Sequence, residues 1–452
     1  MSRSTPPSPF LPFLLGGLLV ALATWPRPQP NPLSGAALTG RILEIVDARY
    51  VEKIDSEELL SIGINRMLGE LDRNSAYFPP RQATEFQNEM NGTLFGIGII
   101  MQMTEDGIRI THVLKDGPAD QSGLPAKSRL ISIDGENCED WSLSKISSTI
   151  QGKQGTSVTL KVQILNEIVT CTPVRDEVFI PSLTESALYS TPENQSLVGL
   201  IRLQQFQPGS TDEVREALKA LKAEELSGLI IDLRNNPGGV LEEAVRFCSL
   251  FLEKGKEIVS TRNRRKSEET DQRSSTQSSL GTGPWFNLPL VILIDGNSAS
   301  ASETVSAALR DHQRAVLVGE KSYGKWTVQG VFHLDSSETP ALLKLTTDSF
   351  FPPRGNRLLY DDRGLPNGLV PDLETPISEE ERYALYDAWS DRFYVRLADL
   401  QVSMDPSSRT EAVPLPNEIS DPALEAAVKL LENGERYQQL LQEPPLSERS
   451  PR

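Results

Sequence analysis

Strand-like and helix-like segments alternate between Ser196 and about Leu373, and this alternation limits the choice of fold more than any other feature of the chain. Short aliphatic runs, long enough for buried strands, are separated by segments whose apolar residues recur at helical spacing. We expect strands at 197–203, 228–233, 290–294 and 316–319, and helices at 211–222, 240–252 and 300–309. Such alternation is typical of α/β layering, in which helices pack on a sheet.

The flanking blocks have a different character. Residues 38–90 show helical spacing, with Asp55 or Ser56 as the cap of a second helix. Residues 92–168 are short strands separated by turns, 262–283 are a polar loop, and the acidic C-terminal block is mostly helical, for packing or oligomerisation. We therefore divide the chain into a leader or anchor (1–25), a helical region (38–90), a β-rich module (92–168), an α/β core (175–374) and a helical acidic region (375–452).

The first residues have the form of a targeting segment. Arg3 precedes the uncharged stretch Phe10 to Ala23, and Ala21-Leu22-Ala23 has the small-x-small pattern of a signal cleavage site. The apolar run is short for a bilayer span, which favours cleavage over an uncleaved anchor. We expect an exported, periplasmic or extracytoplasmic protein, whose only membrane contact would be through this segment if it stays uncleaved.

Composition excludes several classes of function. The 452 residues carry a formal charge of -17 with a pI near 4.8, which argues against a nucleic-acid partner. The three cysteines, Cys138, Cys171 and Cys248, are expected to be small buried hydrophobes, and Cys138 with Cys171 is the one pair worth considering as a disulfide. No metal-ligand spacing is present, so we expect no metal and no organic cofactor.

Three serines follow the aliphatic run at 290–294, in Asn297-Ser298-Ala299-Ser300-Ala301-Ser302-Glu303. The turn residues before them place the serines at the first turn of a helix beyond the end of a strand. There a hydroxyl can act as a nucleophile, because free helix N–H groups stabilise developing negative charge. Serine is also a common N-cap and packs closely, so the pattern alone leaves both interpretations open.

A nucleophile needs a proton acceptor. None of the three histidines, His112, His312 and His333, lies in a recognisable catalytic pattern, and we expect structural roles for them. Lys325 is the alternative, since burial lowers a lysine pKa from its reference of about 10.4 by up to roughly 3 to 5 units. In a β-prone stretch Gln329 shares its face, where it can hold the amine without adding a counter-charge.

Several motifs in this chain, including the serine and lysine segments, resemble those of a known peptidase family. The serine motif, Gly324-Lys325 with Val328-Gln329, and the stretch Asp232 to Gly239 (DLRNNPGG) resemble motifs of the carboxyl-terminal processing, or tail-specific, serine peptidases. The resemblance implies Ser300 as nucleophile, Lys325 as base 25 residues later and Gln329 as the third member. Ser298 and Ser302 would then be helix-start and packing residues. The implied fold is a ClpP/crotonase-like layered α/β core with an inserted PDZ-like domain and helical N- and C-terminal regions.

The same resemblance implies binding groups. The oxyanion donors would be the N–H of Ala301 and of a glycine, Gly239 as first choice and Gly238 as second. The β-rich module resembles a PDZ domain, in which the loop Phe95-Gly96-Ile97-Gly98-Ile99 would capture a substrate's C-terminal carboxylate. Similarity runs from about residue 40 to 374 and includes Leu71-Asp72-Arg73-Asn74-Ser75.

Some positions depart from the family pattern. Trp326 stands where the family usually has glycine, which either buries Lys325 more deeply or distorts its loop. Lys127-Ser128 replaces the usual Gly-Asp of the PDZ-like module, which puts ligand details in doubt more than fold. The hypothesis is an exported endopeptidase that takes protein substrates with accessible C-terminal tails. A non-catalytic peptide-binding scaffold on the same fold and a serine esterase on another fold are the alternatives, and an oligomer stays open.

Overall fold

The computed structural model describes residues 35–90, 93–104, 107–114, 116–165, 167–179, 182–191, 196–263, 275–334, 340–355, 367–395 and 420–443. The leader expected at 1–25 lies outside the described residues. The chain divides into two units, Met1–Glu70 and Leu71–Arg452. No helix in the described ranges is long and apolar enough to cross a membrane.

In the first unit the structure describes residues 35–70, which form α2 (Gly35–Arg49) and α3 (Ser56–Gly69). Asp55 caps α3, because its side chain accepts hydrogen bonds from the N–H groups of Glu57 and Glu58. No residue of α2 is buried, and only Leu68 of α3 is. The helices predicted here are therefore present, with their apolar residues largely exposed.

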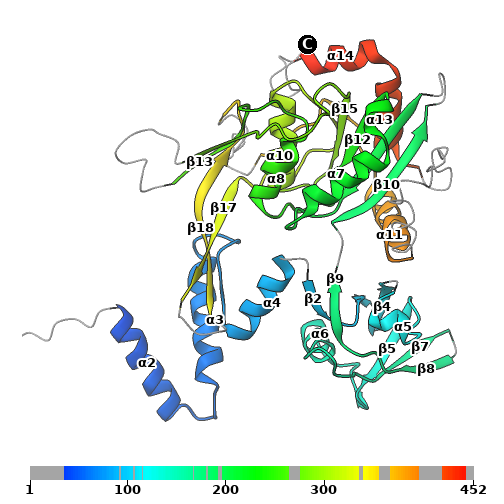
Figure 1. Cartoon of the computed structure of the whole chain (residues 1–452). Helices are drawn as coiled ribbons and strands as arrows, with labels where there is room; N and C mark the ends of the chain where they lie inside the picture. Colours follow the sequence, from blue (N-terminus) through cyan, green and yellow to red (C-terminus); the bar gives the residue numbers. More distant parts are fainter. Residues whose placement is uncertain are drawn as a thin grey trace, which may run out of the picture. The chain divides into compact units, whose positions relative to one another are not determined.

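The second unit is built on a six-stranded sheet (Figure 1). Its first two strands are antiparallel and the remaining pairs are parallel. In order across the sheet the strands are β10 (Leu183–Ser190), β11 (Leu197–Leu203), β12 (Gly228–Asp232), β15 (Leu290–Ile294), β16 (Val316–Gly319) and β19 (Leu373–Glu374). The strand segments predicted from the aliphatic runs are confirmed, because strands covered on both faces must be apolar throughout.

Helices cover both faces of this sheet. One core joins the sheet to α7 (Ser210–Ala220), α8 (Leu241–Cys248) and α10 (Ala301–Asp311). A second core lies on the opposite face under α13 (Pro422–Glu432) and α14 (Gly434–Gln442). A short 3₁₀ helix, Ala223–Glu225, precedes β12. The acidic C-terminal block thus supplies a layer of the core, and it also contributes α11 (Glu379–Val395).

A second sheet has the path β1 (Ala76–Phe78), β18 (Leu342–Phe351), β13 (Glu257–Arg262) and β14 (Ser275–Ser278), with β17 (Thr327–His333) paired to β18. The prediction of a loop over 262–283 is wrong at β14, which pairs with β13. Its sequence, Ser-Thr-Gln-Ser, is polar because both faces of this edge strand are largely exposed, so it lacks the apolar pattern of a buried strand.

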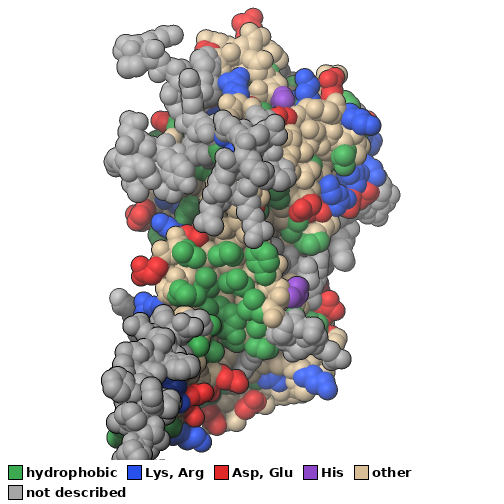
Figure 2. Space-filling model, turned by 90° about the vertical axis from the view of Figure 1, so that its left-hand side faces the viewer, with side chains coloured by type: hydrophobic (Ala, Val, Ile, Leu, Met, Phe, Trp, Pro, Cys, Tyr) green, Lys and Arg blue, Asp and Glu red, His purple; other side chains and the backbone are tan. Residues whose placement is uncertain are grey.

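Hydrophobic side chains gather on the face of the molecule shown in Figure 2.

The β-rich module has a core of its own. After α4 (Pro80–Met90), its elements are β2 (Thr93–Gly96), β3 (Ile99–Thr104), β4 (Gly107–Val113), α5 (Pro118–Gln121), β5 (Ser128–Ile133), β6 (Glu136–Asn137), α6 (Leu143–Ile150), β7 (Leu160–Ile164) and β8 (Glu167–Cys171), and β9 (Asp176–Phe179) pairs back with β2. Cys138 and Cys171 are buried here as free thiols, as is Cys248 in the α/β core, so the Cys138–Cys171 disulfide is absent.

Candidate active site

Ser300 lies where the chain passes from β15 into α10. It is the N-cap of α10, with φ 57° and ψ -111°, a left-handed conformation that a residue with a side chain rarely adopts. Backbone strain of this kind is concentrated at functional sites, where the surrounding contacts maintain it. The side chain is half-buried rather than buried. The turn therefore presents Ser300 in the manner expected of a nucleophile.

The two neighbouring serines have structural contacts. Ser298 Oγ donates to Leu233 O at 2.8 Å and accepts from the N–H of Asp295 at 3.0 Å. Ser302 Oγ donates to Asn236 O at 3.0 Å. Both side chains are fully buried, so their hydroxyls hold the turn together.

Glu303 connects the serine to the lysine, a role that the sequence did not reveal. Its Oε2 accepts from the N–H of Ser300 at 2.9 Å and from the N–H of Lys325 at 2.8 Å. Its Oε1 accepts from Ser322 Oγ at 2.5 Å and from the N–H of Gly324 at 2.7 Å. Burial raises the pKa of Glu303, and the four donors oppose that shift. One carboxylate oxygen thus holds the backbones that carry the predicted nucleophile and base.

Lys325 is suited to act as a base. Burial lowers its pKa, the positive charge of Lys344 lowers it further, and Glu303 opposes the shift. Among the described residues, neither Ser300 nor Gln329 makes a hydrogen bond to its ammonium group. Because its pKa is lowered, a larger fraction of the Lys325 amine is neutral at a given pH than for an exposed lysine. A general base needs this neutral form to take a proton.

Gln329 takes part in a different set of contacts. Its Nε2 donates to Thr327 Oγ1 at 3.0 Å and to Thr346 Oγ1 at 3.2 Å. The backbone N–H of Thr346 in turn donates to Ser75 Oγ, which itself donates to Asp72. The segment at 71–75 thus supports the strand pair on which Gln329 lies. The predicted contact of Gln329 with the amine is not made in this structure.

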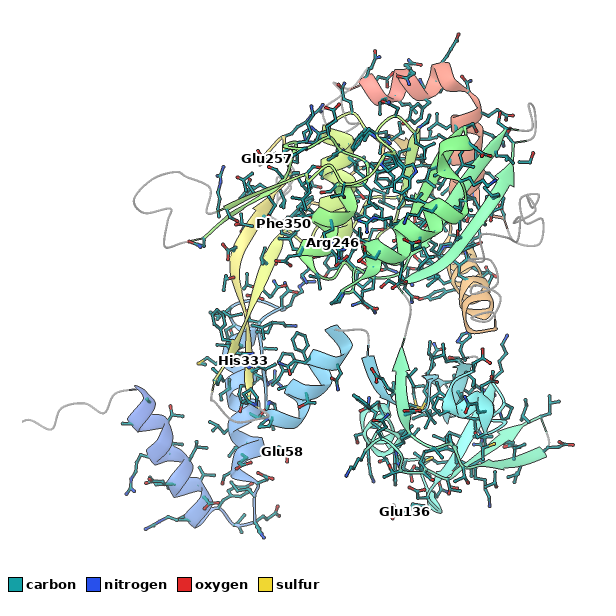
Figure 3. All side chains as sticks on the ribbon, in the orientation of Figure 1. Glu58, Glu136, Arg246, Glu257, His333 and Phe350 are labelled. Atoms are coloured by element: carbon teal, nitrogen blue, oxygen red, sulfur yellow. The ribbon has the colours of Figure 1, made fainter. Side chains whose placement is uncertain are left out.

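Trp326 is turned into the core. Its Nε1 donates to Asn367 O at 3.0 Å, and its ring lies 5.3 Å from that of Phe350, which is labelled in Figure 3. Val328 packs against the same core. Trp326 and Val328 thus lie on the core side, as predicted, while a β-bulge between Val328 and Gln329 interrupts the regular alternation. Trp326 anchors the lysine segment rather than distorting it.

The turn after β12 approaches the serine closely. A Cβ on Gly238, whose φ is +101°, would lie 2.8 Å from Ala301 N and 2.9 Å from Ser300 Cβ, so a side chain is excluded. The N–H of Gly238 is already used, donating to Asn236 Oδ1 at 2.9 Å. Gly238 therefore does not serve as the second-choice oxyanion donor. In the described part of the chain no acceptor occupies the N–H of Gly239 or of Ala301.

The histidines lie elsewhere. His312 Nε2 is bonded to Glu257 O at 2.6 Å, and His112 Nδ1 to Thr111 Oγ1 at 3.1 Å. Figure 3 shows His333 at the far end of the β17–β18 hairpin from Phe350. Their positions agree with the structural roles expected for them. No group of His, Cys, Asp or Glu within the described ranges could hold a metal ion.

The predicted tail-binding loop is partly a strand. Phe95 and Gly96 end β2 and pair with β9, while Ile97 and Gly98 form the connection to Ile99 at the start of β3. Gly98 has φ +76°, and Ile97 is buried. Their N–H groups have no acceptor among the described residues, which is the arrangement that captures a carboxylate.

Replacing Glu303 with glutamine is expected to lower kcat for peptide cleavage by about 10- to 100-fold with little change in KM, because an amide cannot accept all four hydrogen bonds. Loss of the negative charge also lowers the pKa of Lys325, so the acid limb of the pH–rate profile should move to lower pH. The measurement is kcat and KM as a function of pH.

Glu243→Gln is the matched control. Glu243 is another buried glutamate that accepts several hydrogen bonds, among them the N–H of Gly209 and of Thr211, far along the chain from the serine turn. The Glu243→Gln variant should lower thermal stability and leave the pH–rate profile of peptide cleavage unchanged. Equal effects of the two variants on kcat would contradict a specific role of Glu303.

Comparison with known proteins agrees with this geometry. Residues 197–375 match the model of peptidase family S41, and 109–164 match a PDZ domain. The chain is 31% identical over 380 residues to the carboxy-terminal-processing protease of Bartonella bacilliformis, covering 83% of each protein. It is 30% identical over 338 residues to a protein of Staphylococcus aureus named as a CtpA-like serine protease, covering 74% of this chain and 64% of that one.

A solved structure shows the same fold. The S41 protease of Bacteroides fragilis matches with a TM-score of 0.51 and 15% identity, over 90% of this chain and 99% of that one. The expected α/β core with a PDZ domain is therefore confirmed. Together with the sequence identity to the Bartonella protein, these matches show that the chain is a serine peptidase and belongs to peptidase family S41, among the carboxy-terminal-processing proteases.

Proposed function

We propose that this protein is an exported endopeptidase that cleaves protein substrates near their C-termini through an acyl-enzyme on Ser300, with Lys325 as general base and Gln329 assisting. One observation carries the proposal: the buried carboxylate of Glu303 accepts hydrogen bonds from the backbones of both Ser300 and Lys325. The lowered pKa of Lys325 supports its role.

The reaction would begin when the neutral amine of Lys325 takes the proton of Ser300 Oγ as that oxygen attacks the substrate carbonyl carbon. The resulting oxyanion would accept hydrogen bonds from the free N–H groups of Gly239 and Ala301. The lysine ammonium then protonates the leaving amine as the peptide bond breaks. The neutral amine then removes a proton from water as the water attacks the ester carbonyl, and the resulting ammonium returns that proton to Ser300 Oγ as the acid product leaves.

Gln329 would hold the lysine amine through its carbonyl oxygen. Its Nε2 is occupied by Thr327 and Thr346, whereas its Oε1 accepts no hydrogen bond from the residues that the structure describes. A side-chain movement that brings Lys325 Nζ to that oxygen would let the amine donate a hydrogen bond to it. An amide acceptor orients the amine without a negative charge that would raise its pKa.

The PDZ domain would select the substrate by its tail. The N–H groups of Ile97 and Gly98 are free to bind a terminal carboxylate, and an extended peptide would add as a strand to the sheet. Binding the tail in one domain concentrates the preceding peptide bonds at Ser300. The substrate class is therefore proteins with an accessible C-terminal tail.

Two peptides that differ only in a free or an amidated C-terminus test this selection. Removing the terminal charge is expected to raise KM by about 10- to 100-fold with kcat retained, since hydrogen bonds to a charged group contribute roughly 1.5–3 kcal/mol. Steady-state kinetics on the full chain give both constants. Equal KM values would remove the carboxylate from recognition and leave the hydrolytic site intact.

Export follows from the leader at 1–25. Mass spectrometry of the protein from a bacterial host should find a mature first residue after Ala23 in the extracytoplasmic fraction. An intact N-terminus in the membrane fraction would indicate an anchor, and recovery of the intact chain from the cytoplasm would contradict export.

A further inference from the structure

Three neighbouring parallel strands end at the same edge of the central sheet, and each is followed by a loop of the site. The turn at 235–239 follows β12, the serine turn at 295–300 follows β15, and the segment at 320–325 follows β16. Their ladders are parallel and adjacent. The three loops must therefore keep their relative positions at one sheet edge for the reacting groups to meet.

Helix α11 contacts a residue at the start of each loop. Arg382 pairs with Glu320 at 2.6 Å, and the hydroxyl of Tyr386 donates to Asp295 Oδ2. The Trp389 ring lies 4.6 Å from the Arg234 guanidinium carbon. Positions 382, 386 and 389 are four and three residues apart, so they share one face of the helix.

Asp295 joins two of the loops. Its carboxylate accepts from the N–H of Asn235 at 3.0 and 3.2 Å, and from the N–H groups of Asn297 and Ser298 at 3.0 and 3.1 Å. The first bond belongs to the glycine turn and the others to the serine turn. The hydroxyl of Tyr386 is a further donor to this carboxylate from outside both loops. Through Asp295, Tyr386 thus contacts the carboxylate that holds the glycine turn and the serine turn together.

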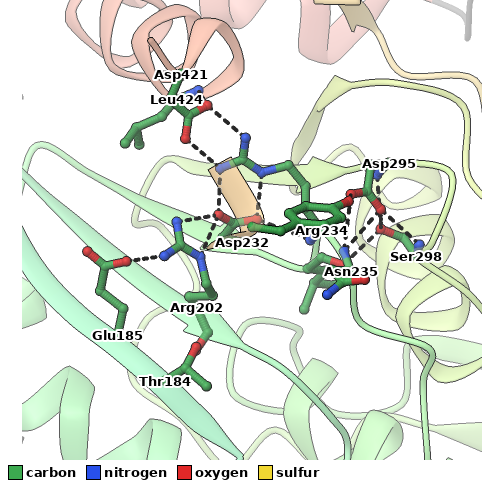
Figure 4. A network of polar contacts seen from close by, with 12 residues as sticks. Thr184, Glu185, Arg202, Asp232, Arg234, Asn235, Asp295, Ser298, Asp421 and Leu424 are labelled. Atoms are coloured by element: carbon green, nitrogen blue, oxygen red, sulfur yellow. Dashed lines mark hydrogen bonds and ion pairs between the residues drawn. The ribbon is translucent and has the colours of Figure 1, made fainter. Parts of the chain in front are cut away.

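Arg234 supports the start of the glycine turn in the same way. Its guanidinium is fully buried between Asp232 and Asp421, with bonds of 2.7 to 2.9 Å (Figure 4). Trp389 lies over this guanidinium and, at 3.9 Å, over that of Arg202, which also pairs with Asp232. Burial alone would raise the pKa of Asp232, but the two guanidinium groups lower it.

Side chains of α11 and of the loops also line a shared pocket. It has a volume of about 490 Å³, and its lining includes Gly296, Asn297, Lys321 and Glu379. The Arg382–Glu320 and Tyr386–Asp295 contacts thus connect the helix to two of the loops beside this pocket.

We propose that α11 is a positioning helix for the proposed site, and that Tyr386 is a positioning residue that acts through Asp295. The inference rests on the proposed function, since it assigns the loops their catalytic roles. It gives part of the C-terminal region a role in the chemistry beyond packing.

Tyr386→Phe in the full chain removes only the hydroxyl. We expect kcat for peptide cleavage to fall about tenfold with KM within twofold, since a small misplacement of reacting groups slows chemistry strongly. Tyr383→Phe is the matched control, because Tyr383 is on the same helix and 73% exposed. It should leave kcat unchanged. Rates are divided by the concentration of folded enzyme, measured by circular dichroism at the assay temperature.

The outcomes separate the hypotheses. Equal kcat values for Tyr386→Phe and Tyr383→Phe would overturn the proposal. If Tyr386→Phe is poorly folded, Trp389→Phe, which keeps a ring over Arg234, decides instead: a drop in kcat with unchanged KM supports positioning, and wild-type kcat overturns it. A failure of the proposed function would appear independently, as peptide cleavage by a Ser300→Ala variant.

Discussion

Replacing Ser300 with alanine is expected to lower kcat for peptide cleavage by on the order of 10⁴-fold or more, since the nucleophile of an acyl-enzyme mechanism has no substitute. Stability should change little, because the hydrogen bonds of Ser300 with the side chains of Glu303 and Thr304 are made by its backbone. Tail binding in the PDZ domain should remain. The measurement is cleavage of a peptide with a free C-terminus, followed by chromatography, with the thermal midpoint recorded in parallel.

Ser302→Ala is the control within the same turn. Ser302 also lies in the first turn of the helix, but its hydroxyl is buried and donates to Asn236 O. We expect a loss of about 1 kcal/mol in stability and activity within tenfold of wild type. If Ser302→Ala were inactive and Ser300→Ala active, the nucleophile would be misassigned. Acid quenching of wild type during turnover should in addition give an adduct on the peptide that contains Ser300.

Replacing Lys325 with arginine is expected to lower kcat by about 10³-fold, within the range of roughly 10² to 10⁴ for loss of a general base. The guanidinium stays charged at any working pH and cannot take the proton of Ser300. Lys321→Arg, four residues earlier at an exposed position, should retain wild-type kinetics. Turnover by Lys325→Arg at the wild-type rate would exclude the lysine as the base.

The pH dependence follows from the same group. Burial and the charge of Lys344 lower the pKa of Lys325, and the neutral amine is the reactive form. The wild-type rate should therefore rise with pH and level off at a pH below 10.5, the ordinary pKa of a lysine. A rate that still rises in proportion to hydroxide at pH 10.5 would mean that no perturbed amine is involved.

The desolvation that lowers the pKa of Lys325 also destabilises the folded state while the lysine is charged. Below the folded pKa the ammonium is charged in both states, and the native state bears the full penalty of desolvation. As pH rises toward the unfolded pKa, the unfolded state binds more protons, so stability increases with pH in that window. Lys325→Met, which removes the charge, should accordingly raise the thermal midpoint at pH 7 while abolishing activity.

Much of the site could be predicted from local patterns. Aliphatic runs at 228–233 and 290–294 indicate strands because a strand covered on both faces must be apolar. The turn before Ser300, and the alternation that puts Trp326 in the core, likewise depend on residues close in sequence. The motifs around Ser300 and Lys325 and the stretch at 232–239 carried the resemblance to the family, which the comparisons confirm.

Other features came only from tertiary contacts. Glu303 appears in the sequence as an ordinary third residue of a helix, and nothing local shows that its two carboxylate oxygens accept from the N–H groups of Gly324 and Lys325. The choice between Gly238 and Gly239 depends on which N–H is occupied by Asn236. The polar edge strand β14 is a strand because β13 pairs with it, since its own residues supply no hydrophobic driving force.

From the sequence alone, periodicity and turn residues predicted the α/β core and a β-rich module, because these are local properties. The resemblance of the motifs added the PDZ domain and the roles of Ser300, Lys325 and Gln329. Only the tertiary structure decided how β12, β15 and β16 bring their loops to one edge, and how α11 and Glu303 hold those loops. The hydrogen bond between Tyr386 and Asp295 joins residues 91 positions apart, so the chain must fold before the partners meet, and no pattern within one segment encodes it.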